Sequence, residues 1–183
     1  MGHQIYIRQK DFDSVKYTIK ILKCPYCGEY GMLVLHGYIY GQNEMRNTVI
    51  KGRRVFCSNR YRRKGCGRTI AYCLANFIRQ SFLCAKTAWK FLSEILKGSS
   101  IEKAYNSLNT SYTISISALY LFWNKFRLKT DTIRSAISNH FLLSPSYANC
   151  PYRETIFHLE EVFSNAYSNP IESYQRQFQR CFV

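Results

Sequence analysis

The first part of the chain carries short apolar and β-branched runs of the length that predicts strands. Residues 5–8 and 15–22 are rich in Ile, Val, Tyr and Thr, and residues 32–40 and 48–56 form two further runs of this kind. A Gly41-Gln-Asn turn signal lies between the last two runs. We therefore expect residues 1–72 to form a small β ribbon.

The hydrophobic period becomes helical from about residue 75. Gly98 suits the C-terminal cap of a first helix, and Ser99-Ser-Ile-Glu102 resembles a capping box that opens a second, short helix. Ser115 is expected to cap a third helix of about a dozen residues, after a turn at 109–112. The predicted buried stripes of these helices are Ala85, Ala88, Trp89, Leu92, Ile95 and Leu96, then Ile101, Ala104, Tyr105 and Leu108, then Ile116, Leu119, Tyr120, Trp123 and Phe126.

Further helical segments are predicted towards the end of the sequence. We expect a helix over 130–142 with Asp131 as its cap, a break at 143–151 and a helix over 154–166. Asn169-Pro170 is expected to open a last helix, because proline suits the first helical turn. The apolar stripe of that helix, formed by Ile171, Tyr174, Phe178 and Phe182, either packs back on the bundle or binds a partner.

Four of the eight cysteines have the spacing of a metal site. Cys24-Pro-Tyr-Cys27-Gly28 is a knuckle in which two thiolates converge on one ion while the glycine permits the tight bend. Cys57 and Cys66, with eight residues between them, are expected to supply the second pair. A closed set of four thiolates favours structural zinc, which contributes folding energy that a small ribbon lacks.

Other residues compete for the metal or stand apart from it. Cys73, in a core-like run, and His36, in a predicted strand, are the alternative ligands. Cys84, Cys150 and Cys181 are scattered and are expected to be buried thiols. Without an apolar signal core at the N-terminus, a disulfide scaffold is a poor explanation for the cysteines, and a reducing, cytoplasmic location is expected.

The charge of +15 is concentrated in one block of the sequence. Residues 45–93 hold 12 basic and no acidic side chains, which suits a polyanionic ligand. The eight residues between Cys57 and Cys66 form a basic insertion that we expect to project from the metal site. The predicted phosphate contacts are Arg53, Arg54, Arg60, Arg62, Arg63, Lys64 and Arg68.

The short helix, polar turn and longer helix predicted over 100–127 have the dimensions of a helix-turn-helix. Its second helix would present Ser117, Leu121, Asn124 and Lys125 outward, and Ser117, Asn124 and Lys125 are the candidate contacts to DNA bases and phosphates. The predicted fold class is α+β, with a zinc ribbon at 1–72, a helical domain with the helix-turn-helix at 73–142 and a C-terminal helical extension at 143–183.

Enzymatic chemistry is not indicated. The sequence has three aspartates, none of them within the basic block, whereas two-metal strand transfer needs clustered carboxylates. Neither a GxxxxGK[ST] phosphate loop nor a nucleophile elbow occurs. We expect a protein that is not an enzyme and has no membrane span, since no apolar run approaches 18 residues.

The cysteine strings resemble those of a known family. Cys24-Pro-Tyr-Cys27-Gly28, followed by Arg54-Val-Phe-Cys57-Ser-Asn-Arg60 and by Gly65-Cys66-Gly67-Arg68-Thr69, is similar to the N-terminal zinc ribbon of insertion-sequence transposases. A helix-turn-helix commonly follows that ribbon, and the resemblance covers roughly residues 22–127. The sequence departs from the family in its stretched second knuckle and in lacking an acidic catalytic domain. The resemblance therefore implies a DNA-binding accessory or regulator of a mobile element.

The expected function is zinc-dependent binding of double-stranded DNA near the nucleoid, with a transposase or recombinase subunit as a further partner. The sequence is also consistent with two alternatives. Basic ribbons with interleaved tyrosines, here Tyr38, Tyr40 and Tyr61, also serve as RNA-binding modules. The chain could instead be an interaction subunit that bridges a transposase complex.

Overall fold

The computed structural model describes residues 3–108, 114–145, 150–164 and 169–183. Within these residues the fold is mixed α/β, with one four-stranded sheet and six α-helices. The chain divides into two compact units, Met1–Gly41 with Thr48–Ala75, and Gln42–Asn47 with Asn76–Val183. We call them unit 1 and unit 2 and describe each by itself. The predicted three-part division at residues 72 and 142 stays a prediction.

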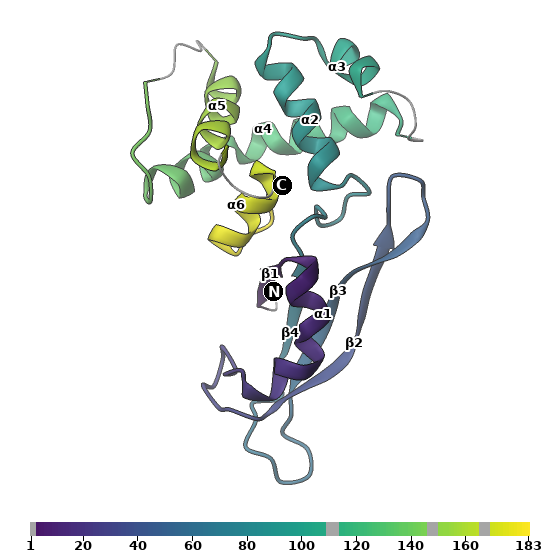
Figure 1. Ribbon diagram of the computed structural model, residues 1–183, viewed down its shortest axis with the longest axis vertical. Helices are drawn as coiled ribbons and strands as arrows, with labels where there is room; N and C mark the ends of the chain where they lie inside the picture. Colours follow the sequence, from purple (N-terminus) through teal and green to yellow (C-terminus); the bar gives the residue numbers. More distant parts are fainter. Residues whose placement is uncertain (1–2, 109–113, 146–149, 165–168) are drawn as a thin grey trace. The chain divides into compact units, whose positions relative to one another are not determined.

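Unit 1 is built on a sheet with strand order β1-β4-β3-β2 (Figure 1). β1 pairs in parallel with β4, and β3 pairs with β4 in the antiparallel sense, so Tyr72 lies opposite both Ile5 and Arg53. The strands predicted at 32–40 and 48–56 are confirmed, with slightly later ends. The elements of this unit are β1 (Gln4–Ile7), α1 (Gln9–Thr18), the 3₁₀ helix η1 (Ile19–Ile21), β2 (Leu33–Gln42), β3 (Thr48–Cys57) and β4 (Thr69–Leu74).

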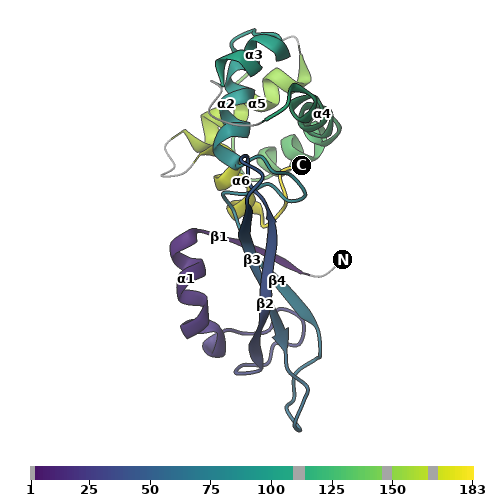
Figure 2. The same ribbon diagram turned by 90° about the vertical axis from the view of Figure 1, so that its right-hand side faces the viewer.

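Residues 15–22 are largely helical, so the strand predicted there is wrong. α1 and η1 occupy most of this segment and place Phe12, Val15 and Ile19 at helical spacing, all of them buried. Figure 2 shows α1 along one face of the sheet, where Val15 and Ile19 join the core formed with Leu33, Val55, Ile70 and Tyr72. Burial of this helical face outweighs the β propensity of the local sequence.

Unit 2 is helical in its described part, and its helix ends follow the predicted caps. Ser100, Ser115 and Asn169 each accept a hydrogen bond from a backbone N–H of the first turn that they cap. Ser100, not Ser99, opens its helix, so Glu102 does not take the capping-box position. Gly98 follows the first helix with φ +95°, as expected of a C-terminal glycine. The helices are α2 (Ala85–Leu96), α3 (Ile101–Ser107), α4 (Ile116–Ser138), α5 (Pro151–Phe163) and α6 (Pro170–Phe178).

α4 is one helix of 23 residues, which corrects two predictions. We expected a helix of about a dozen residues, then a separate helix over 130–142 capped by Asp131. Instead Asp131 is an exposed residue within α4, and the buried positions Phe126, Thr130, Ile133 and Ile137 continue one apolar stripe through it. The turn predicted at 109–112 lies outside the described residues.

The core of unit 2 includes the C-terminal helix. Ile171, Tyr174 and Phe182 are buried in the same cluster as Phe91 and Phe126, and the rings of Phe126 and Phe182 stack with centroids 5.8 Å apart. The apolar stripe of α6 therefore packs back on its own unit, and this face is covered. Among the described residues, no helix combines the length and the apolar character needed to cross a bilayer.

Candidate metal centre

The first pair of cysteines lies in a tight turn after η1. The backbone N–H of Gly28 donates to the carbonyl of Cys24 at 2.8 Å, and the N–H of Cys24 donates to the carbonyl of Glu29 at 3.0 Å. Gly28 has φ +76°, a left-handed conformation that glycine adopts at little cost. This turn directs the side chains of Cys24 and Cys27 to one point, as the Cys-x-x-Cys-Gly spacing predicts.

The second pair is brought together where β3 ends and the chain returns towards β4. Cys57 is the last residue of β3, and its sulfur accepts a hydrogen bond from the N–H of Cys66 at 3.3 Å. The N–H of Gly67 donates to the carbonyl of Cys57 at 2.9 Å, and the N–H of Cys57 donates to the carbonyl of Arg68 at 2.9 Å. The two chain segments thus pair through backbone hydrogen bonds at the base of the insertion and hold both sulfurs beside each other.

The four sulfurs form a cluster with the dimensions of a tetrahedral site. All four lie within 4.8 Å of one another, with Cys24 and Cys66 at 3.8 Å and Cys27 and Cys57 at 3.7 Å. A tetrahedron of thiolates about 2.3 Å from a metal has edges of about 3.8 Å, whereas a disulfide bond is about 2.05 Å long. The four cysteines therefore have the arrangement that could hold a metal ion.

The electrostatics of the cluster are uneven. Burial raises the pKa of the Cys24 thiol, but hydrogen bonds from the backbone of Cys27 and Tyr26 outweigh it, and the pKa falls to about 7. Burial dominates at Cys57 and raises its pKa to about 12. Thiols must lose their protons to bind a metal, and burial favours the protonated form of Cys57, so metal binding by this cluster would release protons.

The alternative ligands lie outside this cluster. Cys73 is half-buried in β4, and the ring of His36 packs against Phe56 at a centroid distance of 6.2 Å. Cys84 is the N-terminal cap of α2, where its sulfur accepts a hydrogen bond from Thr87. The expectation that Cys84, Cys150 and Cys181 are buried thiols needs correction, because each of them is only partly buried.

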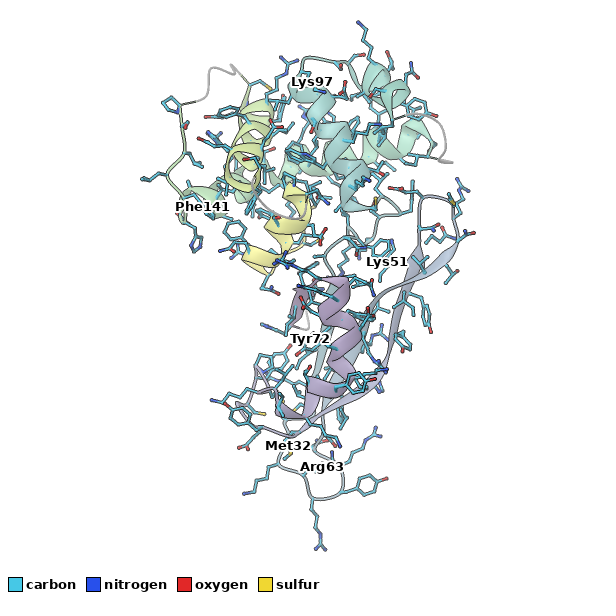
Figure 3. All side chains as sticks on the ribbon, in the orientation of Figure 1. Met32, Lys51, Arg63, Tyr72, Lys97 and Phe141 are labelled. Atoms are coloured by element: carbon cyan, nitrogen blue, oxygen red, sulfur yellow. The ribbon has the colours of Figure 1, made fainter. Side chains whose placement is uncertain are left out.

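The insertion between the second pair of cysteines forms a closed loop, residues 58–65, which we call the basic loop. Arg60, Arg62, Arg63 and Lys64 are all exposed on it. The side chain of Arg63 points away from the ribbon beyond the ends of β3 and β4 (Figure 3). None of these four cations forms an ion pair within the part of the chain that the structure describes.

The other predicted phosphate contacts lie on or just before strands. Arg68 is exposed directly before β4, with its guanidinium 4.9 Å from the ring centre of Tyr26. Arg53 and Arg54 are neighbours in β3 and therefore point to opposite faces of the sheet. Arg54 is exposed, whereas Arg53 is half-buried with its guanidinium 4.5 Å from the ring centre of Tyr38. The seven cations therefore do not share a single face.

Sequence reasoning missed the cation–π pairs of this unit. Arg68 lies over Tyr26, Arg53 lies over Tyr38, and Arg60 lies 5.6 Å from the ring centre of Phe56. The first two pairs join residues far apart in sequence, so no local pattern could have revealed them. They orient guanidinium groups that would otherwise sample many rotamers.

The candidate base contacts lie in unit 2. Ser117, Asn124 and Lys125 are exposed on the first half of α4, as predicted, together with Leu121. Leu119, Trp123 and Phe126 from the same half are buried in the core of the unit. Tyr120 is exposed and Ile116 is half-buried, so these two do not belong to the inner face as expected.

A search against the models of known protein families, the curated proteins and the solved structures finds no match to this chain.

Proposed function

We propose that this protein binds DNA, and that zinc held by Cys24, Cys27, Cys57 and Cys66 orders the surface that does so. The observation that carries the proposal is the position of the basic loop directly between two ligands of the sulfur cluster. Four thiolates in a tetrahedron favour zinc among the common cellular metals. A closed site of this kind is structural, so zinc would act by fixing the chain.

Fixing the chain matters because the loop carries unpaired positive charge. With both ends tied to one ion, Arg60, Arg62, Arg63 and Lys64 lose less conformational freedom on binding than the same residues in a free loop. Arg68 follows the second ligand pair closely and adds a fifth cation. A phosphate backbone offers regularly spaced negative charges, and release of its counterions would drive binding regardless of base sequence.

The sequence preference, in this proposal, comes from a helix-turn-helix formed by α3 and α4. The exposed Ser117, Asn124 and Lys125 lie in the first half of α4, the part of a recognition helix that contacts base edges. Asn pairs well with adenine, and Lys binds guanine or phosphate. Each good contact of this kind contributes about 1–3 kcal/mol to discrimination between bases.

The resemblance to the zinc ribbons of insertion-sequence transposases supports a role beside a mobile element. We propose an accessory or regulatory protein without catalytic activity, located in the cytoplasm with the nucleoid, that acts next to a separate transposase or recombinase.

The salt dependence of binding to a blunt DNA duplex tests the phosphate contacts. Five engaged cations predict a slope of log K against log salt of about −4.5, at about −0.9 for each contact. Replacing Arg62 and Arg63 by alanine should reduce this slope by about 1.8 and weaken binding to all duplexes alike. The control removes two exposed positive charges outside the basic loop, in the variant Lys10→Ala with Lys86→Ala.

Three results would contradict the proposal. One is a slope that stays the same in the double arginine variant, and another is a loss of affinity confined to one DNA sequence. The third is equal weakening by the control variant, which would mean that only net charge matters. A structured RNA bound more tightly than the duplex would favour the RNA-binding alternative.

A further inference from the structure

The tip of the basic loop presents an aromatic ring that makes little contact with the protein. Tyr61 is 94% exposed, while the cations beside it in sequence, Arg60 and Arg62, are exposed as well. Other exposed tyrosines of unit 1 have partners. The rings of Tyr38 and Tyr40 lie 6.1 Å apart, and Lys23 lies over Tyr30. Tyr61 is therefore the ring most available to a ligand among these.

The backbone holds Tyr61 in a turn that its side chain does not favour. The N–H of Arg63 donates to the carbonyl of Arg60 at 3.2 Å, which closes a four-residue turn. Its two central residues, Tyr61 and Arg62, have φ +54° and +62°. Positive φ at both central positions is typical of a type I′ turn, where Gly and Asn are usual. Here two bulky side chains occupy those positions, in a backbone conformation that L-residues with a Cβ atom disfavour.

The base of the loop fixes the direction in which the tip points. The N–H of Gly65 donates to the carbonyl of Ser58 at 3.2 Å. A Cβ atom on Gly65 would lie 2.2 Å from that carbonyl oxygen, so the two segments approach as closely as glycine allows. Below this contact lie Cys57 and Cys66, which belong to the sulfur cluster. A side chain placed on such a support is well suited to stacking, because little ordering remains to be done on binding.

The chemistry around the ring selects its occupant. Arg60, Arg62, Arg63 and Lys64 surround Tyr61 in sequence, and a partner protein would have to neutralise all four. A nucleic-acid strand brings phosphates for the cations and a flat base for the ring at the same time. In an intact duplex the faces of the bases are covered by their neighbours in the stack. Away from the duplex ends, the ring can reach a base face only where a base is unpaired.

We infer that Tyr61 is a stacking platform for an unpaired DNA base, so that the basic loop prefers single-stranded or locally unpaired DNA over an intact duplex. This inference rests on the proposed DNA binding and names the form of DNA that the loop recognises. The cations hold the backbone of the strand, and the ring holds one base. Base–aromatic stacking tolerates any sequence, because every base has a flat face.

Binding of two labelled DNAs, a single strand and the blunt duplex of the same sequence, tests the inference by fluorescence anisotropy. Tyr61→Ala should weaken binding to the single strand by about 5- to 150-fold and change duplex binding by less than about twofold. Tyr61→Phe keeps the ring and should bind the single strand about as tightly as the unaltered protein. Tyr61 is exposed, so its replacement removes no core contact, and the metal content of each variant checks the fold.

The outcomes separate this inference from the proposed function. If Tyr61→Ala weakens both DNAs equally, or neither, the stacking role is overturned while DNA binding stands. If the unaltered protein binds neither DNA, the proposed function itself fails. Tighter binding of an RNA strand of the same sequence would overturn the assignment to DNA.

Discussion

Replacing Cys24 with serine is expected to release the metal and unfold unit 1, while unit 2 stays folded. Cys24 is 1% exposed and its sulfur lies 3.8 Å from that of Cys66, so the substitution removes one corner of the tetrahedron. A serine hydroxyl stays protonated at neutral pH, so it does not replace the thiolate as a metal ligand. The remaining three sulfurs leave an open position and a weaker site.

The magnitude follows from the small core of unit 1. Among the described residues of unit 1, the main buried cluster contains eight, and two of these, Cys24 and Cys57, are themselves proposed ligands. Structural zinc contributes about 10–16 kcal/mol to the folding of small domains, whereas the whole stability of a domain is about 5–15 kcal/mol. The metal contribution is therefore about as large as the whole stability of a typical domain, so its loss is expected to unfold unit 1. In the part of unit 2 that the structure describes, the core cluster has 23 buried residues and includes none of the four ligands.

The two units can be followed separately in solution. Both tryptophans, Trp89 and Trp123, belong to unit 2, so tryptophan fluorescence reports that unit, whereas far-ultraviolet circular dichroism reports both. In Cys24→Ser we expect loss of bound metal, loss of the strand signal and an unchanged fluorescence transition in urea. Cys73→Ser, which alters a half-buried thiol outside the cluster, is the control and should keep its metal. Full metal content with unchanged denaturation in Cys24→Ser would show that the ligand assignment is wrong.

Three smaller predictions concern single contacts. Gly65→Ala should destabilise unit 1 by about 1–3 kcal/mol in urea denaturation followed by circular dichroism, because the new Cβ atom would meet the carbonyl of Ser58. An unchanged urea midpoint of unit 1 would disprove that close approach. Asn169→Ala removes the cap of α6 and should lower the stability of unit 2 by about 1 kcal/mol, measured from its urea transition by tryptophan fluorescence. Asn169→Asp keeps a capping oxygen and should leave that stability unchanged. Burial raises the pKa of Tyr174 to about 12. In the unfolded chain the tyrosine hydroxyl has a pKa near 10, so above pH 10 the unfolded state loses this proton while the folded state keeps it. The stability of unit 2 is therefore unaffected by this group below pH 10 and should fall by about 1.4 kcal/mol for each pH unit from pH 10 to pH 12. Tyr174→Phe should lack this dependence, and an equal loss in both proteins would assign it elsewhere.

Local signals in the sequence were sufficient for the first cysteine pair and for the helix starts at Ser115 and Asn169. The Cys24-x-x-Cys27 knuckle and the caps at Ser115 and Asn169 depend on neighbours within a few residues, so pattern and chemistry agree. The rule that four thiolates complete a closed site favoured Cys57 and Cys66 as the second pair but left Cys73 and His36 as alternatives. The cluster confirms that these four cysteines lie together.

The errors arose where packing overrides local pattern. Residues 15–22 alternate like a strand, yet Val15 and Ile19 lie on one helical face that covers the sheet. Asp131 resembles a cap, but Thr130 and Ile133 on either side are buried and continue the stripe of α4. Neither outcome could be predicted without knowing what each face packs against. The parallel pairing of β1 with β4 is likewise a long-range contact with no local signal.

The length of α4 has a mechanical consequence. At about 1.5 Å per residue its 23 residues make a rod of about 35 Å. Exposed Ser117 and Asn124 lie in its first half, while Arg134 in its second half forms an ion pair with Glu154 of α5 at 2.8 Å. Leu119 and Trp123 anchor the first half of this rod in the core of unit 2, and Ile133 and Ile137 anchor the second half in the same cluster. The spacing between the exposed side chains on α4 is therefore set by one continuous helix and does not depend on a joint between two shorter ones.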